Sequence, residues 1–468
     1  MPIDFVPPFP RRLTEVPSPW QRARLWRENM LSVFEQQAFE HDFAQMKFLA
    51  RDIFLCNSPE SVQFALGSHA GSFERKSPTH RHLLEPLIGD GLFVSHGQVW
   101  KQRRRIVASV VHPSRLSELA PVMIETALEA RARWAKLAPA ELDALSEMAQ
   151  LTAEIICRAV FGRQLGRDRA LQIVEGFSDY QRRIGRIDFI SLIGLPDWIP
   201  RPHLPGVYRS VRRVHAAIDD VIAALRSERG GDGTSVISRL FDARDEETGA
   251  PLDPQALRNE AIVLLMAGHE TTANTLAWTW YILSQTPDVE RRLHEEIDAV
   301  VGDRPPTFAD VPKLTYTRAV LEEVMRLYPP VPVLSREAER EEIFDGRRIR
   351  KGSVIVVSPW LLHRHRKLWR NPDHFVPERF LPGSAEPISK FAYIPFSVGP
   401  RVCAGMAFGL TEAILCVATL AQRFRLRMKA GHQVEAKCRI TLRPGERLPM
   451  QLIARTTAQT GSPKMALA

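Results

Sequence analysis

The chain of 468 residues contains only five cysteines, and no two of them lie close together in the sequence (Cys56, Cys157, Cys403, Cys416 and Cys438). Paired C-x-x-C or H-x-x-x-H spacings are missing around them, so the sequence lacks the ligand pattern of a zinc site. An odd number of scattered cysteines also suits a reducing compartment. We therefore predict a soluble, cytoplasmic protein without structural zinc.

The sequence also has no Gly/Ser-rich linker and no internal repeat. Length alone would allow two or three domains, but the motifs of one predicted site run from Trp100 to Cys403. We predict a single domain over residues 1–468, with a proline-rich arm at 1–12 and a disordered tail at 456–468. The arm is too short and too polar for a signal peptide or membrane anchor, so no transmembrane segment is expected.

The net charge is +9, but the basic residues are not interleaved with aromatic ones. Without that pattern or zinc-finger spacing, the charge does not indicate nucleic-acid binding, and no nucleic acid is expected as a partner. The sequence also contains no flavin- or nicotinamide-binding segment. Any electrons that the protein uses must come from outside the chain.

The most informative segment present is the stretch of ten residues from Phe396 to Gly405, which reads F-S-V-G-P-R-V-C-A-G. It places Cys403 after a glycine-proline turn and before an apolar stretch that predicts a helix over Ala404–Leu420. A helix N-terminus favours the thiolate, so we expect the pKa of Cys403 to be lowered. A buried thiolate needs a cation or a metal.

One thiolate acting alone fits the axial ligand of a haem iron, because the porphyrin supplies the other four ligands. In that case Phe396 would pack near the thiolate, and Arg401 would pair with a haem propionate. Gly405 would allow the helix to approach the macrocycle closely. For an isolated cysteine the alternative is a buried structural residue after a tight turn, and only the complete pattern favours the ligand.

The segment resembles the haem-binding signature of the cytochrome P-450 superfamily, F-x-x-G-x-R-x-C-x-G, and matches it at every defined position. The resemblance implies that Cys403 is the proximal thiolate of a b-type haem (iron protoporphyrin IX). It also implies a mainly α (α+β) cytochrome P-450 fold with a large helical bulk. We expect its smaller β-rich portion near Phe48–Leu66 and Ile343–Ser358.

A second motif interrupts an apolar segment that predicts one long helix from an N-cap at Asp253 to Gln285. The polar residues read A-G-H-E-T-T-A-N from Ala267 to Asn274, which is similar to the family's A/G-G-x-D/E-T-T/S pattern. The resemblance implies that Glu270 and Thr271 relay protons to iron-bound oxygen, where Gly268 and the threonines permit a local kink. A transmembrane helix is disfavoured by the central polar residues, and a polar contact between helices is the structural alternative.

Two further fragments resemble a structural network of the family. Glu323 and Arg326 share one face of a predicted helix over Arg318–Tyr328, and Arg379 lies in a P-E-R-F segment. The resemblance implies that the three side chains together hold the segment preceding Cys403. A second E-x-x-R pair at Glu337 and Arg340 lies in a charge-rich run that we interpret as a solvated face.

The remaining family-like positions concern the haem propionates. Trp100 and Arg104 lie one turn apart on a predicted helix, and Arg336 follows a predicted strand at Val331–Leu334. The resemblance implies that these residues bind propionates, whereas each alone would be read as a core tryptophan or a surface arginine. The sequence departs from the family at His363–Trp369, where the usual Asp-Pro turn is missing.

The family resemblance implies a haem-thiolate monooxygenase that inserts one atom of dioxygen into a hydrophobic substrate such as a fatty acid or terpenoid. A peroxide-driven peroxygenase, a haem-thiolate isomerase and a non-enzymatic gas-binding or electron-transfer protein are the alternatives. Ten apolar residues are expected to line the pocket: Leu83, Leu84, Leu87, Ile88, Phe93, Leu264, Leu265, Val331, Val333 and Leu334.

The partner is expected to be a ferredoxin-type or flavin protein. Basic clusters at Lys101–Arg105 and Arg364–Arg370 are interpreted as a docking surface for an acidic redox protein, and a solvated basic face is the alternative. Residues 180–211 mix arginines with apolar residues. They are expected to form a mobile lid or a weak peripheral membrane contact.

Overall fold

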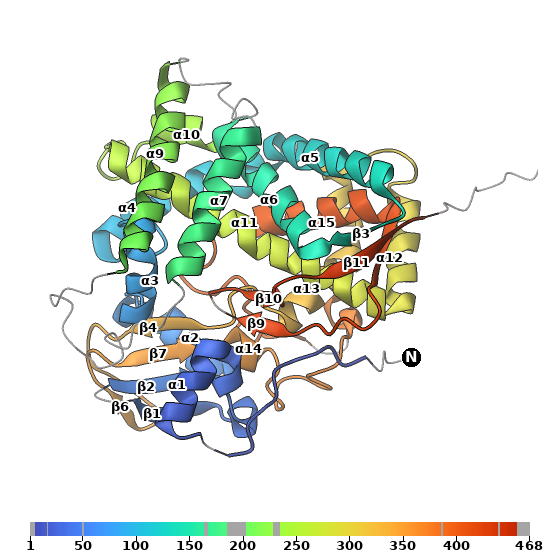
Figure 1. Cartoon of the computed structure of the whole chain (residues 1–468). Coiled ribbons are helices and arrows are strands. Elements are labelled where there is room, and N and C mark those ends of the chain that lie inside the picture. Colours follow the sequence, from blue (N-terminus) through green and yellow to red (C-terminus); the bar gives the residue numbers. More distant parts are fainter. Residues whose placement is uncertain are drawn as a thin grey trace, which may run out of the picture.

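The computed structural model describes residues 5–15, 17–48, 51–162, 167–184, 203–227, 235–384, 387–438 and 440–455. Most of these residues are helical (Figure 1). The α-helices are α1 Pro19–Glu28, α2 Pro59–Gln63, α3 Pro78–Ile88, α4 Gly97–Val110, α5 Leu116–Leu137, α6 Ala144–Phe161, α7 Arg167–Ile184, α9 Pro205–Ser227, α10 Val236–Asp242, α11 Pro254–Gln285, α12 Pro287–Val300, α13 Thr315–Leu327, α14 Pro359–Leu362 and α15 Met406–Ala421.

The strands form four small sheets. They are β1 Phe43–Phe48, β2 Arg51–Cys56, β3 Ala140–Asp143, β4 Leu334–Glu337, β5 Glu342–Phe344, β6 Arg347–Ile349, β7 Val354–Val357, β8 Phe424–Met428, β9 Ala436–Cys438, β10 Leu442–Pro444 and β11 Pro449–Ala454. The largest sheet has the order β1-β2-β7-β4, and β3-β11-β8 forms a second sheet. This composition confirms the predicted mainly helical α+β class.

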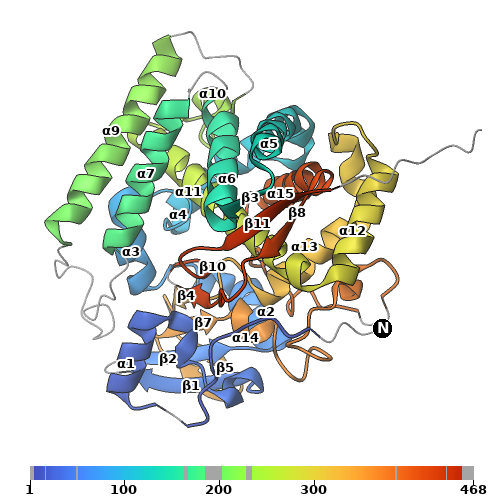
Figure 2. The same cartoon turned by 45° about the vertical axis from the view of Figure 1, so that its right-hand side comes forward.

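The four-stranded sheet joins distant parts of the chain, and Figures 1 and 2 show its blue and orange strands side by side below the helices. Strand β2 pairs in parallel with β7, where Ile53 lies opposite Val354. Strand β4 pairs antiparallel with β7 and places Arg336 opposite Ile355. A bridge between Lys76 and Arg336 continues this edge. The β4 edge of the sheet therefore places the basic residues Lys76 and Arg336 next to each other.

Helix α11 crosses the centre of the molecule (Figure 1) and has the predicted bounds. The Asp253 side chain accepts a hydrogen bond from the Ala256 N–H at 2.8 Å, and Pro254 occupies the first turn. Both features stabilise a helix start, since the first N–H groups lack partners within the helix. Helix α6 packs along α11, so this central helix is buried through most of its length.

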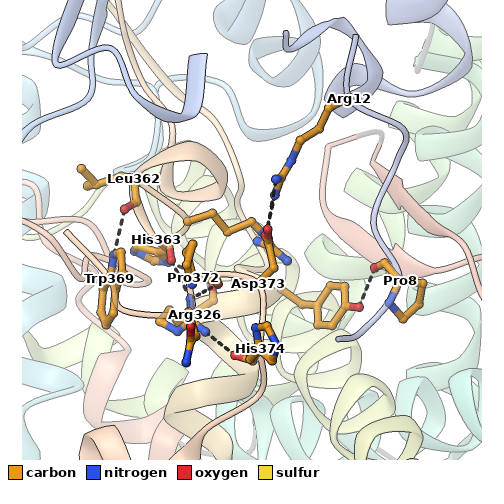
Figure 3. Close-up of polar contacts among 12 residues, drawn as sticks. Pro8, Arg12, Arg326, Leu362, His363, Trp369, Pro372, Asp373 and His374 are labelled. Carbon is orange, nitrogen blue, oxygen red and sulfur yellow. Dashed lines mark hydrogen bonds and ion pairs between the residues drawn. The ribbon is translucent and has the colours of Figure 1, made fainter. Parts of the chain in front are cut away.

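The proline-rich arm is ordered where the structure describes it. The Phe375 N–H donates to the Phe5 carbonyl at 3.1 Å, and the Tyr328 hydroxyl donates to the Pro8 carbonyl at 2.6 Å. Arg12 donates to Asp373 at 3.0 Å and lies over the Phe39 ring. The arm thus packs against the segment that follows α14 (Figure 3). The predicted tail at 456–468 lies outside the described residues.

Three predicted element boundaries were wrong. Strand β2 ends at Cys56, and Ser58 caps helix α2, so the β-rich portion does not extend to Leu66. The strand predicted at Val331–Leu334 starts at Leu334, because the prolines before it lack the N–H groups needed for pairing. Helix α15 begins at Met406, three residues after Cys403.

Candidate active site

The loop that carries Cys403 closes on itself through backbone hydrogen bonds. The Cys403 N–H donates to the Phe396 carbonyl at 2.9 Å, and the Val402 N–H donates to the Gly399 carbonyl at 3.0 Å. Gly399 has φ of 78°, and a Cβ atom there would lie 1.8 Å from the Leu66 carbonyl oxygen. Only glycine fits both the conformation and the space.

Replacing Gly399 with alanine is therefore expected to destabilise the loop by more than the ~1–2 kcal/mol that a left-handed conformation costs. The matched control is Gly431→Ala, which has a similar φ of 77° and no atom within 4 Å of the added methyl group. Thermal unfolding of both variants measures the difference. Equal losses of stability would show that the contact with Leu66 does not constrain the loop.

Cys403 is exposed, whereas the other four cysteines are buried. Protein atoms nevertheless surround its thiol, and this burial raises the pKa of Cys403 above the ordinary value. The Gly405 N–H and the charge of Arg104 lower the pKa of Cys403, but by less than burial raises it. The predicted lowering of the pKa was therefore wrong for the protein alone, because burial outweighs both effects.

Two arginines and a tryptophan lie around this loop. Arg104 donates from Nη1 to the Val402 carbonyl at 2.9 Å, which ties α4 to the cysteine loop. Arg401 donates from Nη2 to the Ser95 carbonyl at 2.6 Å, and its guanidinium lies 4.8 Å from the centre of the Trp100 ring. The structure thus brings together three of the residues that the resemblance assigned to propionate binding.

A buried basic cluster continues from Arg401 to the four-stranded sheet. Burial lowers the pKa of Arg336 to about 9 and that of His80 to about 3, and it lowers the pKa of Lys76 well below its usual range. The neighbouring cations lower these values further. Glu74 opposes the effect at Arg336 and Arg401, and Glu339 opposes it at Arg401. The three cations Lys76, Arg336 and Arg401 outnumber these two carboxylates.

Excess buried cations beside an exposed thiol fit a ligand that combines anionic groups with a metal ion. The two propionates of haem would supply negative charge to Arg336, Arg401 and Lys76, and its iron would take the Cys403 sulfur. A Cβ atom at Gly405 would point at the Cys403 Sγ from 4.0 Å, so glycine keeps this side of the sulfur open. The residues present therefore fit haem.

Replacing Arg336 with methionine is expected to affect the haem-free and haem-loaded proteins in opposite directions. Without haem, the variant removes a buried charge that neighbouring cations repel, and the free energy of unfolding should rise. With haem, it removes a partner of a propionate, so haem should transfer faster to apomyoglobin. Chemical denaturation and haem-transfer kinetics measure the two effects. Slower or unchanged haem transfer would show that Arg336 does not bind a propionate.

Glu270 and Thr271 lie side by side on α11 but have different surroundings. The Thr271 hydroxyl donates to the carbonyl of the exposed Ala267 at 2.6 Å. The Glu270 carboxylate accepts from the Thr441 hydroxyl at 2.7 Å and from Arg443 at 3.0 Å. Gln181 of α7 donates to its second oxygen at 2.5 Å. No sequence motif indicated these three partners, because they come from distant segments.

Gly268 serves packing rather than the predicted kink. A Cβ atom at this position would lie 2.7 Å from the Ile156 side chain, so glycine permits α6 to approach α11 closely. The ribbon of α11 is one uninterrupted α-helix from Pro254 to Gln285. The expected local opening of the helix at Gly268 was wrong for this structure.

The predicted structural network is assembled behind the cysteine loop. Glu323 and Arg326 form an ion pair at 2.7 Å with both side chains fully buried, and Arg379 lies 3.5 Å from Glu323. Arg326 also donates to the carbonyls of His363, Pro372 and His374, and Figure 3 shows these bonds converging on it. The pair therefore binds the backbone of the segment between α14 and Arg379.

His363 extends this network to the cysteine loop. Its Nε2 accepts a hydrogen bond from the Ile394 N–H at 2.9 Å, and its Nδ1 faces the Arg326 carbonyl at 3.3 Å. Burial and the charge of Arg326 lower the pKa of His363 to about 3, which keeps the ring neutral and Nε2 free to accept. His363 lies in the stretch that departs from the family pattern, and no motif indicated this role.

The structure bears on two interpretations of charged residues. Glu337 is only partly exposed, because it forms ion pairs with Arg51, Arg75 and Arg81 at 3.5, 3.4 and 2.9 Å, whereas Arg340 is exposed as predicted. The predicted basic clusters are also largely neutralised. Their members pair with nearby carboxylates or lie buried: Arg103 with Asp90, Arg105 with Asp245, Arg366 with Glu40, Lys367 with Asp42, and Arg364 in the core.

The ten predicted pocket residues divide into two groups. Five are buried in the structure: Leu84, Leu87, Ile88, Leu265 and Val333. The other five are only partly buried: Leu83, Phe93, Leu264, Val331 and Leu334. Of the predicted lid at 180–211, residues 185–202 lie outside the described part of the chain. Among the helices that are described, none is long and apolar enough to cross a membrane.

Comparison with known proteins identifies the family. The family model described as Cytochrome P450 matches residues 7–446. Cyclooctatin synthase from Streptomyces melanosporofaciens is 32% identical over 88% of each chain. Pentalenene oxygenase from Streptomyces avermitilis is 28% identical, over 80% of this chain and 82% of its own. The cytochrome P450DA heme domain has a TM-score of 0.80 at 23% identity, over 96% of this chain and 97% of that one. The chain therefore belongs to the cytochrome P450 family and is a haem-iron monooxygenase.

Proposed function

We propose that this enzyme inserts one atom of dioxygen into an apolar, terpenoid-like substrate, with Cys403 as the axial ligand of haem b. The observation that carries the proposal is the exposed Cys403 thiol in a loop that Gly399 and Arg104 fix beside a buried basic cluster. The thiolate–haem unit, when complete, supplies the activation of dioxygen. The protein supplies orientation, exclusion of water and protons.

The residues of α11 are proposed to manage protons. The Thr271 hydroxyl donates a hydrogen bond to the Ala267 carbonyl, so the hydroxyl oxygen remains available to accept one. Glu270 is bound to Arg443, whose side chain is 22% exposed. This arrangement supports proton exchange between bulk water and Glu270 from the β10 side. Such a relay is superfluous for a peroxide-driven peroxygenase or an isomerase, which disfavours both alternatives.

The substrate class follows from the partly buried apolar residues and from the relatives. Leu83, Phe93, Leu264, Val331 and Leu334 come from the three regions that were expected to surround the substrate. Two relatives are named for pentalenene and cyclooctat-9-en-7-ol, which are by name a hydrocarbon and an alcohol. The latter relative, cyclooctat-9-en-7-ol 5-monooxygenase from Streptomyces melanosporofaciens, is 32% identical over 74% of each chain. A terpenoid hydrocarbon or alcohol matches both observations better than a fatty acid.

A binding screen tests the substrate class. Purified ferric enzyme is titrated with cyclic terpene hydrocarbons, their mono-alcohols and fatty acids of equal carbon number, and the Soret shift that accompanies loss of iron-bound water is recorded. We expect the terpenes to produce the shift at the lowest concentrations, and product analysis should then show one added oxygen. A response confined to fatty acids would refute the terpenoid assignment.

The redox partner is proposed to be an acidic ferredoxin-type protein that docks beside the cysteine loop. Val99 and Met406 are exposed apolar residues on α4 and α15, the two elements that flank this loop, and Lys101 is exposed in the same turn of α4. An apolar centre with a nearby cation suits transient docking of an acidic protein. The neutralised clusters around Arg105 and Arg366 contribute less than the sequence predicted.

Replacing Lys101 with glutamate is expected to slow reduction by acidic ferredoxins and to reduce the dependence of the rate on salt. Stopped-flow reduction at several ionic strengths measures both. The matched control is Lys390→Glu, since Lys390 lies over the Phe391 ring and outside α4 and α15. Equal effects of the two substitutions would assign the change to net charge instead of docking.

A further inference from the structure

The loop between α3 and α4, residues 89–96, passes directly against α11. Gly89 has φ of 52°, and a Cβ atom there would overlap the Asn259 amide. A Cβ atom at Gly91 would lie 2.8 Å from the Val263 side chain. Larger residues at these positions would push the loop away from the helix. The two glycines therefore bring the loop into contact with the first half of α11.

Glu260 of α11 binds the middle of this loop. The Leu92 N–H donates to Glu260 Oε1 at 2.9 Å, and Arg103 Nε of α4 lies 3.6 Å from the same oxygen. Glu260 is 0% exposed. Beside it, the Asn259 amide donates to one oxygen of Asp90 at 2.9 Å, and Arg103 donates to the other at 3.0 Å. Neighbouring side chains of two helices thus hold the loop.

The other side of the loop contacts the residues that fit haem. Arg401 donates to the Leu92 and Ser95 carbonyls at 3.3 and 2.6 Å. The Lys76 ammonium lies 4.2 Å from the centre of the Phe93 ring. Leu92 and Phe93 are both partly buried. The loop therefore connects the basic cluster with α11, and a shift of its backbone would move both apolar side chains.

Glu260 lies on the face of α11 that also carries Thr271. Leu264, Ala267 and Thr271 follow Glu260 at spacings of four, three and four positions, which place all of them along one side of a helix. None of these three residues is fully buried. The helical rise puts Glu260 about 16 Å before Thr271. A loop that is held at Glu260 therefore borders the face along which we place the substrate.

We propose that Glu260 is a positioning residue for substrate binding, which holds the 89–96 loop closed beside the substrate site through the Leu92 N–H. It does not touch the reacting atoms, and Asn259 and Arg103 support it by holding Asp90. Without this contact the loop moves away from α11 and carries Phe93 with it. The inference rests on the proposed function for the location of the substrate.

The buried carboxyl group makes the closed loop sensitive to pH. Burial raises the pKa of Glu260 to about 8, and Asp90 also raises it, whereas Arg103 and the Leu92 N–H lower it. Helices α3 and α9 also pack on α11, but neither contributes a charge to this shift. When the loop opens and water reaches the carboxyl group, its pKa returns toward the ordinary value of 4.5. Opening therefore releases a proton between these two values. The open fraction should rise by up to about tenfold per pH unit until about pH 8 and then level off.

Hydrogen exchange tests whether Glu260 holds the loop. Peptides that cover residues 89–96 are followed by mass spectrometry in the holoenzyme at pH 7. Glu260→Leu lacks the acceptor and should exchange about tenfold faster, as expected for one lost buried hydrogen bond. Glu260→Gln keeps an acceptor and should remain protected. The control is Glu322→Leu on α13, since burial also raises the pKa of Glu322. Equal loop exchange in Glu260→Leu and Glu322→Leu would overturn the proposal.

Ligand kinetics test whether the loop controls the substrate site. The apolar haem ligand 1-phenylimidazole is released from the ferric enzyme by dilution in a stopped-flow instrument between pH 6 and 9. Its dissociation rate should rise up to about pH 8 in the native enzyme, stay slow in Glu260→Gln and be fast at every pH in Glu260→Leu. A native pH profile that persists in Glu260→Gln would overturn the proposal. The reduced carbon monoxide complex of each variant reports the thiolate separately, so an error in the haem assignment would appear there and not in the exchange of the loop.

Discussion

Replacing Cys403 with serine is expected to abolish oxygenation and the strongly red-shifted Soret band of the reduced carbon monoxide complex. The shift requires a thiolate bound to the haem iron, and Cys403 is the residue that would supply it. A serine hydroxyl retains the shape of the side chain but does not ionise at neutral pH. Difference spectroscopy of the reduced protein and product analysis measure the two effects.

The control for this substitution is Cys56→Ser, since Cys56 is a buried residue of β2 in the four-stranded sheet. That variant should keep the red-shifted band and lose only stability. A red-shifted band that persists in Cys403→Ser would assign the ligand to another residue. The result is informative because Cys403 is exposed, while the other four cysteines are buried.

Replacing Glu323 with glutamine is expected to destabilise the enzyme by about 3–5 kcal/mol and to accelerate loss of haem. The substitution leaves the guanidinium of Arg326 fully buried without its carboxylate, and Arg379 loses the same partner. The Val376 N–H also donates to Glu323 at 2.8 Å, so the segment after α14 loses an anchor. Chemical denaturation and haem-transfer kinetics measure the consequences.

A second ion pair on the same helix provides the comparison. Arg318 and Glu322 are four residues apart on α13 at 3.3 Å, and the Arg318 side chain is 55% exposed. Removing that pair with Arg318→Ala should cost less than about 1 kcal/mol and should not affect haem retention. Similar losses in the two variants would mean that burial of the Glu323 pair has no special consequence.

The local motifs were predictable because each depends on neighbouring residues. The start of α11 follows from an N-cap aspartate and a proline, and the Glu323–Arg326 pair follows from helical spacing. The partners of Glu270 were not predictable, since Gln181 and Thr441 lie 89 and 171 positions away. Distances of that kind are set by the packing of α7 and β10 and leave no periodic signal.

Part of the basic cluster around Arg336 was also not predictable from local sequence. Arg336 was identified by its place after a predicted strand, whereas Lys76 and His80 belong to no motif. Lys76 meets Arg336 through a bridge at the edge of the sheet, and His80 contacts the Ser335 hydroxyl of β4 at 2.6 Å. Glu337 was misjudged for a related reason. Its three arginine partners come from β2, from the segment before α3 and from α3 itself, so local sequence did not indicate these ion pairs.

The parallel pairing of β2 with β7 has a consequence for the order of assembly during synthesis. Arg51 donates a hydrogen bond to the carbonyl of Gly352, which is 301 positions later. Until the ribosome has released residues 354–357, one edge of β2 has no strand to pair with, and the basic residues of β4 have no sheet to hold them. The Cys403 loop is translated later still. Productive capture of haem is thus a late event, and a nascent chain that is stalled before β7 presents an open strand edge.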